Sequence, residues 1–187
     1  MSASKQPIRL LVFYHDDVDP SLQRLVPRNY LQDCIIEIQK ITGRECIIDY
    51  RRSIAGVTDF NYKGHEKAVL DEWIGRVGVY VEQNGLSWKK TYRYLLVTKD
   101  KLNDRVLGVT YEGNNCLISS LVAYQNIGHE LGHSFGATHE DAELQYNSFG
   151  VLSETFVYPH RDGKRGNAYR YSLKNRENIA NFLRSDD

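Results

Sequence analysis

The sequence has few of the residues that mark specialised classes of protein. Its 187 residues include three cysteines, four prolines and a single methionine, Met1. So small and odd a number of cysteines does not suggest a disulfide framework. Cys34, Cys46 and Cys116 are therefore expected to be free thiols, with a Cys34–Cys46 bridge as the main alternative.

Excess charge of one sign and long apolar runs are also lacking. Lys and Arg together number 24, as do Asp and Glu, so the formal net charge is +0. This balance gives no electrostatic footprint for nucleic acid or for a membrane surface, and neither is expected as a partner. No apolar run approaches the length needed to cross a membrane. With 41% hydrophobic and 26% charged residues, the composition is that of a folded globular protein.

The start of the chain does not resemble a signal peptide. Residues 1–7 are mostly polar, and the apolar run over residues 8–14 is short and leads into Asp16 and Asp17. This run is interpreted as a core strand. The compartment is left open: cytoplasmic, exported without a classical signal, or a mature secreted form supplied without its leader.

The length fits one compact domain over residues 1–187, with an N-terminal part over about 8–138 and a C-terminal part over about 139–187. Apolar spacing predicts strands over residues 8–14, 46–50, 92–98, 105–111 and 116–118. Helices are predicted over 28–42, 66–83 and 175–183, with irregular structure between 139 and 170. The expected fold is α/β (α+β): a mixed, twisted sheet backed by two long helices, with an active-site helix and a small irregular C-terminal subdomain that ends in a helix.

The most informative segment is residues 129–139. On a helix, His129 and His133 lie one turn apart and point the same way, so their imidazoles can share a metal ion. Glu130 lies beside them, within reach of a water on that metal. Gly136 can take the left-handed conformation that ends the helix and brings His139 back as the third ligand. Three protein ligands leave the fourth position of a tetrahedral zinc to water, which is typical of a catalytic site.

The residues around this segment fit a helix. Ile127, Leu131 and Phe135 recur at helical spacing and are expected to face the core. Ser119 and Ser120 precede a run with few helix breakers, and a serine there is predicted to cap the helix. The alternative is a core helix on which the histidines occur by chance.

The H-E-x-x-H-x-x-G-x-x-H pattern of residues 129–139 resembles the extended motif of the metzincin clan of zinc endopeptidases. Residues 94–98, residues 107–113 and the Cys116 that follows resemble the adamalysin branch of that clan. Residues 154–160 resemble the methionine turn of the same branch. The resemblance covers roughly residues 91–183.

This resemblance implies a metzincin-like catalytic domain with one catalytic Zn²⁺ at the floor of a cleft. The implied zinc ligands are His129, His133 and His139. Glu130 would be the general base. A protein or peptide substrate would add as a strand to the edge of the sheet, although the same segment can be a simple sheet edge. The residues implied to contact the substrate are Gly108, Val109, Thr110 and Tyr158.

The sequence departs from the family at several positions. Val157 occupies the place of the methionine that names the turn, and Glu140 stands where an aspartate is usual. In the family, the cysteine that Cys116 resembles pairs with one near the C-terminus, where this chain has none, so Cys116 is expected to stay free. Pro159 takes the place at which other branches carry a tyrosine ligand, and no tyrosine ligand is expected.

The sequence thus predicts a monomeric zinc-dependent endopeptidase, in which a zinc-activated water attacks the peptide carbonyl and Glu130 transfers the proton. The alternative is a zinc-containing protein-binding module with weak or no peptidase activity, which only Val157 favours. A third hypothesis is an effector protease with a single narrow target.

Two other polar clusters are predicted to be solvated loops. An acidic cluster follows the first strand and could otherwise be a second metal site; its members are His15, Asp16, Asp17 and Asp19. A basic patch lies after the turn and could otherwise favour acidic substrate side chains; its members are Arg161, Lys164 and Arg165.

Overall fold

A five-stranded mixed sheet forms the centre of the computed structural model, which describes residues 5–147 and 149–184. The strand order is β2-β1-β3-β5-β4, and only β4 runs antiparallel, at the edge against β5. The strands are β1 (Ile8–Tyr14), β2 (Cys46–Arg52), β3 (Tyr92–Thr98), β4 (Gly108–Thr110) and β5 (Cys116–Ser120). The predicted mixed sheet is confirmed, but β4 is much shorter than the strand predicted over 105–111.

The sheet is buried on both faces, and the sequence of β1 shows why. Leu10 and Val12 belong to one hydrophobic core, whereas Leu11 and Phe13 belong to the other. A strand that is covered on both sides has apolar residues at consecutive positions, because successive side chains point to opposite faces.

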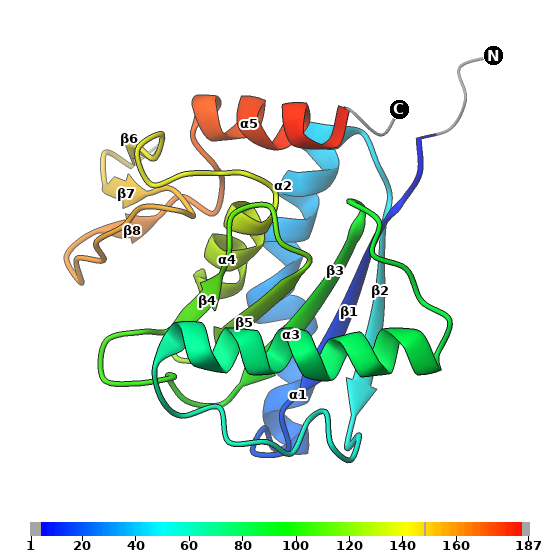
Figure 1. Cartoon of the computed structure of the whole chain (residues 1–187). Coiled ribbons are helices and arrows are strands. Elements are labelled where there is room, and N and C mark those ends of the chain that lie inside the picture. The colour runs from blue at the N-terminus through cyan, green and yellow to red at the C-terminus, as the bar shows by residue number, and fades with distance from the viewer. Residues whose placement is uncertain (1–4, 148, 185–187) are drawn as a thin grey trace.

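Helices cover the two faces of the sheet (Figure 1). The helix α3 (Glu66–Gln83), which matches the predicted helix, contributes the fully buried Trp73 to one core. The Trp73 ring meets Phe13 edge to face, with centroids 5.3 Å apart. The other core takes residues from α2 (Gln32–Thr42), α4 (Asn126–Ser134) and α5 (Leu173–Arg184). The two long helices therefore lie on opposite faces of the sheet.

The first helical region begins earlier than predicted. α1 (Pro20–Val26) leads through a π-helical turn, η1 (Pro27–Leu31), into α2. The Asp19 carboxylate accepts hydrogen bonds from the amides of Ser21 and Leu22, so this residue is the N-cap of α1 rather than part of a solvated loop. Pro27 has no amide hydrogen to donate, and the helix continues past it with the wider π-helical turn.

His15 and Asp17 of the acidic cluster after β1 are half-buried rather than solvated, whereas Asp16 and Asp19 are exposed. His15 lies between the Asp17 carboxylate, 2.8 Å from Nδ1, and the Phe60 carbonyl, 2.7 Å from Nε2. The Tyr62 hydroxyl donates to the other oxygen of Asp17. The prediction was wrong because the loop over residues 53–64 folds across the end of β1 and supplies these partners.

The hydrogen bonds of this cluster change two pKa values. Burial lowers the pKa of His15, but the bonds to Asp17 and Phe60 outweigh it, and the pKa is raised. Burial raises the pKa of Asp17, but the bonds from His15 and Tyr62 outweigh it, and the pKa is lowered. The pair is therefore ionised together over the pH range between the two pKa values.

The C-terminal third is more regular than predicted. Three short strands, β6 (Leu144–Tyr146), β7 (Leu152–Glu154) and β8 (Gly166–Asn167), form a separate sheet at the side of the molecule (Figure 1). The terminal helix α5 is longer at both ends than the helix predicted over 175–183. Phe156, Val157 and Tyr171 from this third lie in the same core as α2 and α4.

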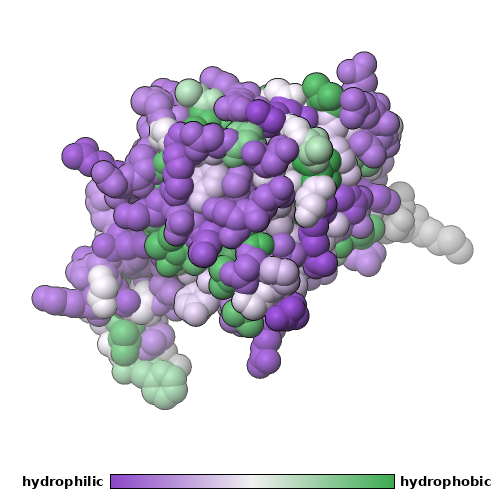
Figure 2. All heavy atoms as spheres, turned by 90° about the horizontal axis from the view of Figure 1, so that it is seen from below, coloured by the Kyte–Doolittle hydropathy of each residue, from purple (hydrophilic) through white to green (hydrophobic). Residues whose placement is uncertain are grey.

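The cysteines and the surface agree with the composition. All three cysteines are free, so the Cys34–Cys46 bridge is not formed. The face seen in Figure 2 is mostly hydrophilic, with hydrophobic residues in small separate patches. Across residues 5–147 and 149–184, no helix combines the length and apolarity that crossing a membrane requires.

We predict that Asp17→Asn destabilises the fold in a pH-dependent way. Because the pKa of His15 is higher in the folded than in the unfolded state, protonated His15 stabilises the fold. This contribution is complete when the pH is below the unfolded-state pKa, and it disappears as the pH rises through the folded-state pKa. Because both groups are partly exposed, the loss at pH 6 should be only about 1 kcal/mol. It should become smaller as the pH rises to 8.5, because His15 loses its proton as the pH passes its folded pKa. Urea unfolding at the two pH values measures this, with the exposed Asp104→Asn as the control. An equal loss at both pH values would contradict the ion pair.

Candidate metal centre

The helix α4 carries the first two histidines and ends at Gly136, as the sequence predicts. The Gly136 amide donates to the His133 carbonyl at 3.0 Å, and the Ala137 amide donates to the Gly132 carbonyl at 2.9 Å. With Gly136 at φ +82°, this is the Schellman pattern of helix termination. The chain reverses there and brings His139 back toward the helix.

The start of α4 differs from the prediction. The helix begins at Asn126, and no side chain caps it, because Ser119 and Ser120 continue β5 and pair with β3. Asn126 instead donates from its side-chain amide to the Leu107 carbonyl at 2.9 Å and to the Ser119 hydroxyl at 2.8 Å. This residue therefore fixes the helix to β5 and to the segment that leads into β4.

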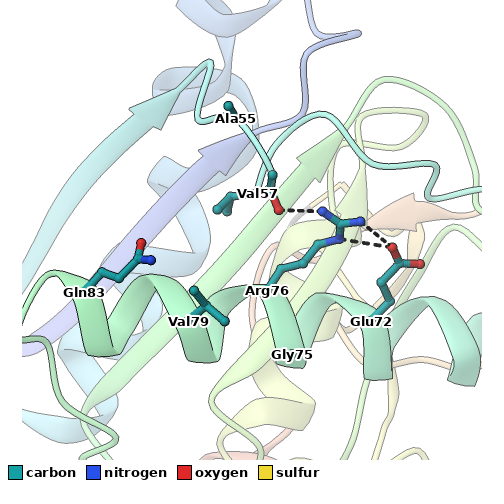
Figure 3. A pocket seen from close by; sticks show the side chains of 8 residues that line it. Ala55, Val57, Glu72, Gly75, Arg76, Val79 and Gln83 are labelled. Atoms are coloured by element: carbon teal, nitrogen blue, oxygen red, sulfur yellow. Dashed lines mark hydrogen bonds and ion pairs between the residues drawn. The ribbon is translucent and has the colours of Figure 1, made fainter.

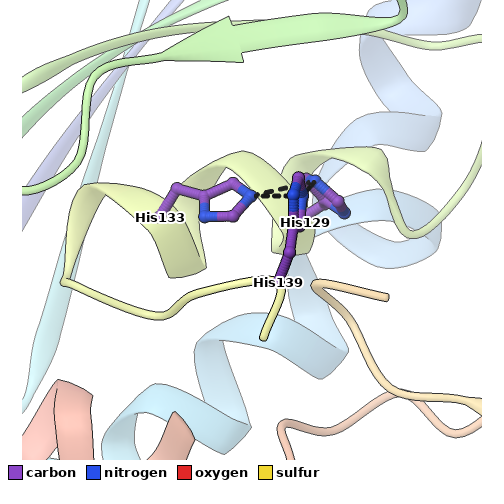
Figure 4. Close-up of side chains that lie close together, drawn as sticks. All are labelled: His129, His133 and His139. Carbon is purple, nitrogen blue, oxygen red and sulfur yellow. Dashed lines mark hydrogen bonds between the residues drawn. The ribbon is translucent and has the colours of Figure 1, made fainter. Parts of the chain in front are cut away.

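The three histidines converge through one nitrogen each (Figure 4). The Nε2 atom of His133 lies 3.1 Å from that of His129 and 3.0 Å from that of His139. The remaining separation, between His139 and His129, is 3.1 Å. Two ligands at about 2.0–2.1 Å from a tetrahedral zinc lie about 3.3–3.4 Å apart, so the spacing fits a single ion closely.

Hydrogen bonds at the other ring nitrogens orient two of these imidazoles. His129 donates from Nδ1 to the Phe156 carbonyl at 2.9 Å, and His133 donates from Nδ1 to the Ala137 carbonyl at 2.7 Å. In a neutral imidazole the other nitrogen then carries a lone pair. The Nε2 atoms of His129 and His133 thus face each other without a proton to share, which is the arrangement of metal ligands.

The pKa values of the three imidazoles favour the neutral, ligating form. Burial lowers the pKa of His129, of His133 and of His139, and charge repulsion between neighbouring histidines adds to the shift. Protonation of any of the three imidazoles is therefore unfavourable at this site. Within residues 5–147 and 149–184, this trio is the group of side chains that can hold a metal ion.

Glu130 is buried next to the histidines, with 5% of its surface exposed. No described residue forms a hydrogen bond with its carboxylate. Burial raises the pKa of this group to about 8, although the charge of Arg161 acts in the opposite direction. The side chain lines a cavity of about 330 Å³ together with His129 and Tyr158.

Gly108 of β4 lies directly against Glu130. A Cβ at this position would lie 2.9 Å from Glu130 Oε1 and 2.7 Å from the Ile118 carbonyl oxygen. Only glycine fits between the two groups, so β4 approaches α4 closely enough to form one side of the cavity. β4 is the last strand in the sheet order, and within the described chain it pairs only with β5.

The segment that resembles the methionine turn packs against α4. A Cβ at Gly128 would lie 2.5 Å from the Phe156 ring, and one at Gly132 would lie 2.9 Å from Val157 Cγ1. Val157 is completely buried. The two glycines of the helix thus let this turn approach closely enough for the Phe156 carbonyl to accept the His129 hydrogen bond.

Residues near the start of α5 position the third histidine, and no local sequence pattern predicts this role. Asn175 accepts from the Thr138 amide at 2.8 Å and donates to the Thr138 carbonyl at 2.9 Å. It therefore pairs with the residue before His139 much as a neighbouring strand would. Asn178 donates to the Asp141 carboxylate at 2.7 Å, on the other side of His139.

Arg93 is a second residue that sequence reasoning missed. Its Nε donates to the Ser134 hydroxyl at 2.8 Å, and its guanidinium carbon lies 4.0 Å from the centre of the Phe135 ring. Burial lowers its pKa to about 9. A charged residue within the apolar run of β3 was the available signal. Arg93 thus links β3 to the C-terminal end of α4.

The three members of the predicted basic patch have different surroundings. Lys164 is exposed, and Arg165 lies 3.6 Å from Glu154 and 5.7 Å from the centre of the Tyr158 ring. Arg161, in contrast, lines the cavity beside Glu130. Arg161 is exposed and lies outside helices and strands, so the loop prediction holds for it, although its side chain borders the cavity.

Another hollow lies along α3, away from the histidines (Figure 3). Its one cation, Arg76, is bound by the Glu72 carboxylate and the Gly56 carbonyl. The hollow has no group of metal-ligating side chains, and its charged residues stabilise the loop over residues 53–64 against the helix.

No known protein family and no curated protein sequence matches this chain. The functional assignment therefore depends on the residues and geometry described above.

We predict that the protein binds one divalent metal ion per chain and that His133→Ala lowers its affinity by more than about 100-fold, since loss of a supporting hydrogen bond alone costs about 10- to 100-fold. Equilibrium dialysis followed by elemental analysis measures the bound metal. The matched control is His160→Ala, which removes a histidine outside the trio. Equal metal content in parent and His133→Ala would exclude this site.

We predict that Gly108→Ala destabilises the fold by about 1–3 kcal/mol, because the added methyl group overlaps Glu130 and the Ile118 carbonyl. Gly75→Ala is the control, because a Cβ there meets nothing within 4 Å. That change should leave the stability equal or higher, as alanine favours a helix interior. Thermal unfolding of the two variants measures the difference. Equal midpoints for both would show that β4 does not approach Glu130 this closely.

Proposed function

We propose that this chain is a zinc-dependent endopeptidase that hydrolyses peptide bonds in protein substrates. One observation carries the proposal: three imidazole nitrogens converge beside a buried carboxylate on the wall of an open cavity. A structural zinc site usually has four protein ligands, whereas three ligands beside a cavity leave room for water and substrate.

Zinc, when bound there, would polarise a peptide carbonyl and lower the pKa of a bound water. Glu130 is the proposed general base, accepting the proton of that water and then delivering it to the leaving amine. Its burial and lack of hydrogen-bond partners leave both carboxylate oxygens available. The positive charge of a zinc ion bound by the three histidines would favour the ionised form of Glu130 that a base requires.

The substrate is proposed to bind along β4 in an extended conformation. On the edge of this short strand that faces away from β5, the main-chain groups of Gly108 and Thr110 are available, whereas those of Val109 face Ile118 of β5. Hydrogen bonds to these groups would hold the peptide as an added strand, with its scissile bond next to Glu130. Tyr158 lies across the same cavity and would contact a substrate side chain.

A zinc-containing binding module with weak or no peptidase activity is the rival proposal. Val157 is the feature that favours it, because valine replaces the methionine of the family that the motif resembles. The retained Glu130, with no structural partner that would explain its burial, favours the enzyme.

We predict that Glu130→Gln keeps the fold and the metal but lowers peptidase activity by at least about 100-fold, because general-base catalysis contributes about 100- to 10,000-fold. A fluorogenic peptide library, with purified zinc-loaded protein, measures the activity. Glu177→Gln is the control, since this glutamate lies on the exposed side of α5 and pairs with Lys174. No cleavage by the parent would favour the binding module, and normal turnover by Glu130→Gln would assign the base to another group.

A further inference from the structure

We propose that the cavity beside Glu130 recognises a carboxylate group of the substrate through Arg105 and Arg161. This inference rests on the proposed peptidase function and specifies the class of substrate. The cavity has a volume of about 330 Å³, and three segments line it: residues 105–108, the start of α4 and residues 158–161. Both arginines thus contribute to the space that opens beside the three histidines.

The first argument is the state of the two guanidinium groups. Within residues 5–147 and 149–184, neither Arg105 nor Arg161 has a carboxylate within ion-pair distance or a side-chain hydrogen bond. Arg24 and Arg28, which lie on the open surface away from the cavity, also lack such partners, whereas six other arginines are engaged by neighbouring side chains: Arg51, Arg76, Arg93, Arg165, Arg170 and Arg176. The two cavity arginines therefore keep free the donors that bind a carboxylate in a two-pronged geometry.

The second argument is the charge of the cavity. Glu130 is the one acidic residue among those that line it, against two arginines. Loss of solvent lowers the pKa of Arg161, and the charges of Glu154 and Glu130 only partly offset this effect. Arg105 and Arg161 are both exposed, so an incoming carboxylate can reach them, and their two positive charges attract it more strongly than a single surface arginine would.

The carboxylate has two chemical sources. It can be the side chain of an Asp or Glu next to the scissile bond, or the C-terminal carboxylate of a short peptide. The first would give an endopeptidase that cleaves beside acidic residues. The second would restrict cleavage to bonds near the end of a chain.

The test compares matched pairs of fluorogenic peptides that differ only by Glu or Gln at one position near the scissile bond. Each pair is made with a free and with an amidated C-terminus. The parent should cleave one carboxylate-bearing peptide at least about tenfold faster in kcat/KM than its amide partner, which corresponds to about 1.4 kcal/mol. The position of the effect identifies the source.

Arg161→Gln and Arg105→Gln should each reduce this preference, mainly by raising KM for the carboxylate-bearing peptide. The exposed Arg24→Gln on α1 is the control and should keep the full preference. Equal losses for the Glu and Gln peptides in Arg161→Gln would mean that the arginine serves Glu130 rather than the substrate. That outcome, or equal cleavage of both peptides by the parent, overturns the proposal.

A binding measurement separates this inference from the peptidase proposal. Fluorescence anisotropy of the same labelled peptides with zinc-loaded Glu130→Gln needs no turnover. Tighter binding of the carboxylate-bearing peptide, lost when Arg161→Gln is added, supports the carboxylate site even if no peptide is cleaved. Equal binding of both peptides overturns it even if the parent is an active peptidase.

Discussion

The close approach of three imidazole nitrogens is the constraint on which the rest of the molecule depends. The Nε2 lone pairs of His129 and His133 face each other 3.1 Å apart and repel, and the fold must hold them there. The carbonyls of Phe156 and Ala137 set the rotation of two rings. Arg93 fixes the end of α4 from the side of β3, and Asn126 fixes its start to β5. The central sheet therefore acts as the rigid support of a site that lies at one of its edges.

Many of the helices and strands, and the histidine cluster, could be predicted because the sequence patterns that specify them are local. The helix over residues 66–83 and the strand over 92–98 follow from apolar spacing, and the ligand set follows from the spacing within residues 129–139. The conformation at Gly136 is likewise a property of one residue and its neighbours. In each case the information lies within a few turns of the chain.

The parts that could not be predicted depend on partners far away in the sequence. Ser120 looks like a helix cap, but its backbone pairs with β3. The residues after β1 look like a solvated loop, but residues 53–64 fold over them. Asn175 and Thr138 are hydrogen-bonded although 37 positions separate them in the sequence. The local sequence around either residue does not predict this contact. Arg161 stands among basic residues, yet only the fold shows that it faces the cavity.

The pairing of Asn175 with Thr138 makes α5 part of the candidate metal centre. α5 is held to α2 by two hydrogen bonds of 2.8 Å from Arg176 to the buried Glu37. Its docking orders the segment that carries His139, so the free energy of binding an ion and the free energy of docking α5 are coupled. Such coupling is reciprocal: an ion that favours the ordered segment also favours the docked helix. Loosening α5 from α2, at a distance from the histidines, would therefore lower the affinity of the candidate centre for an ion.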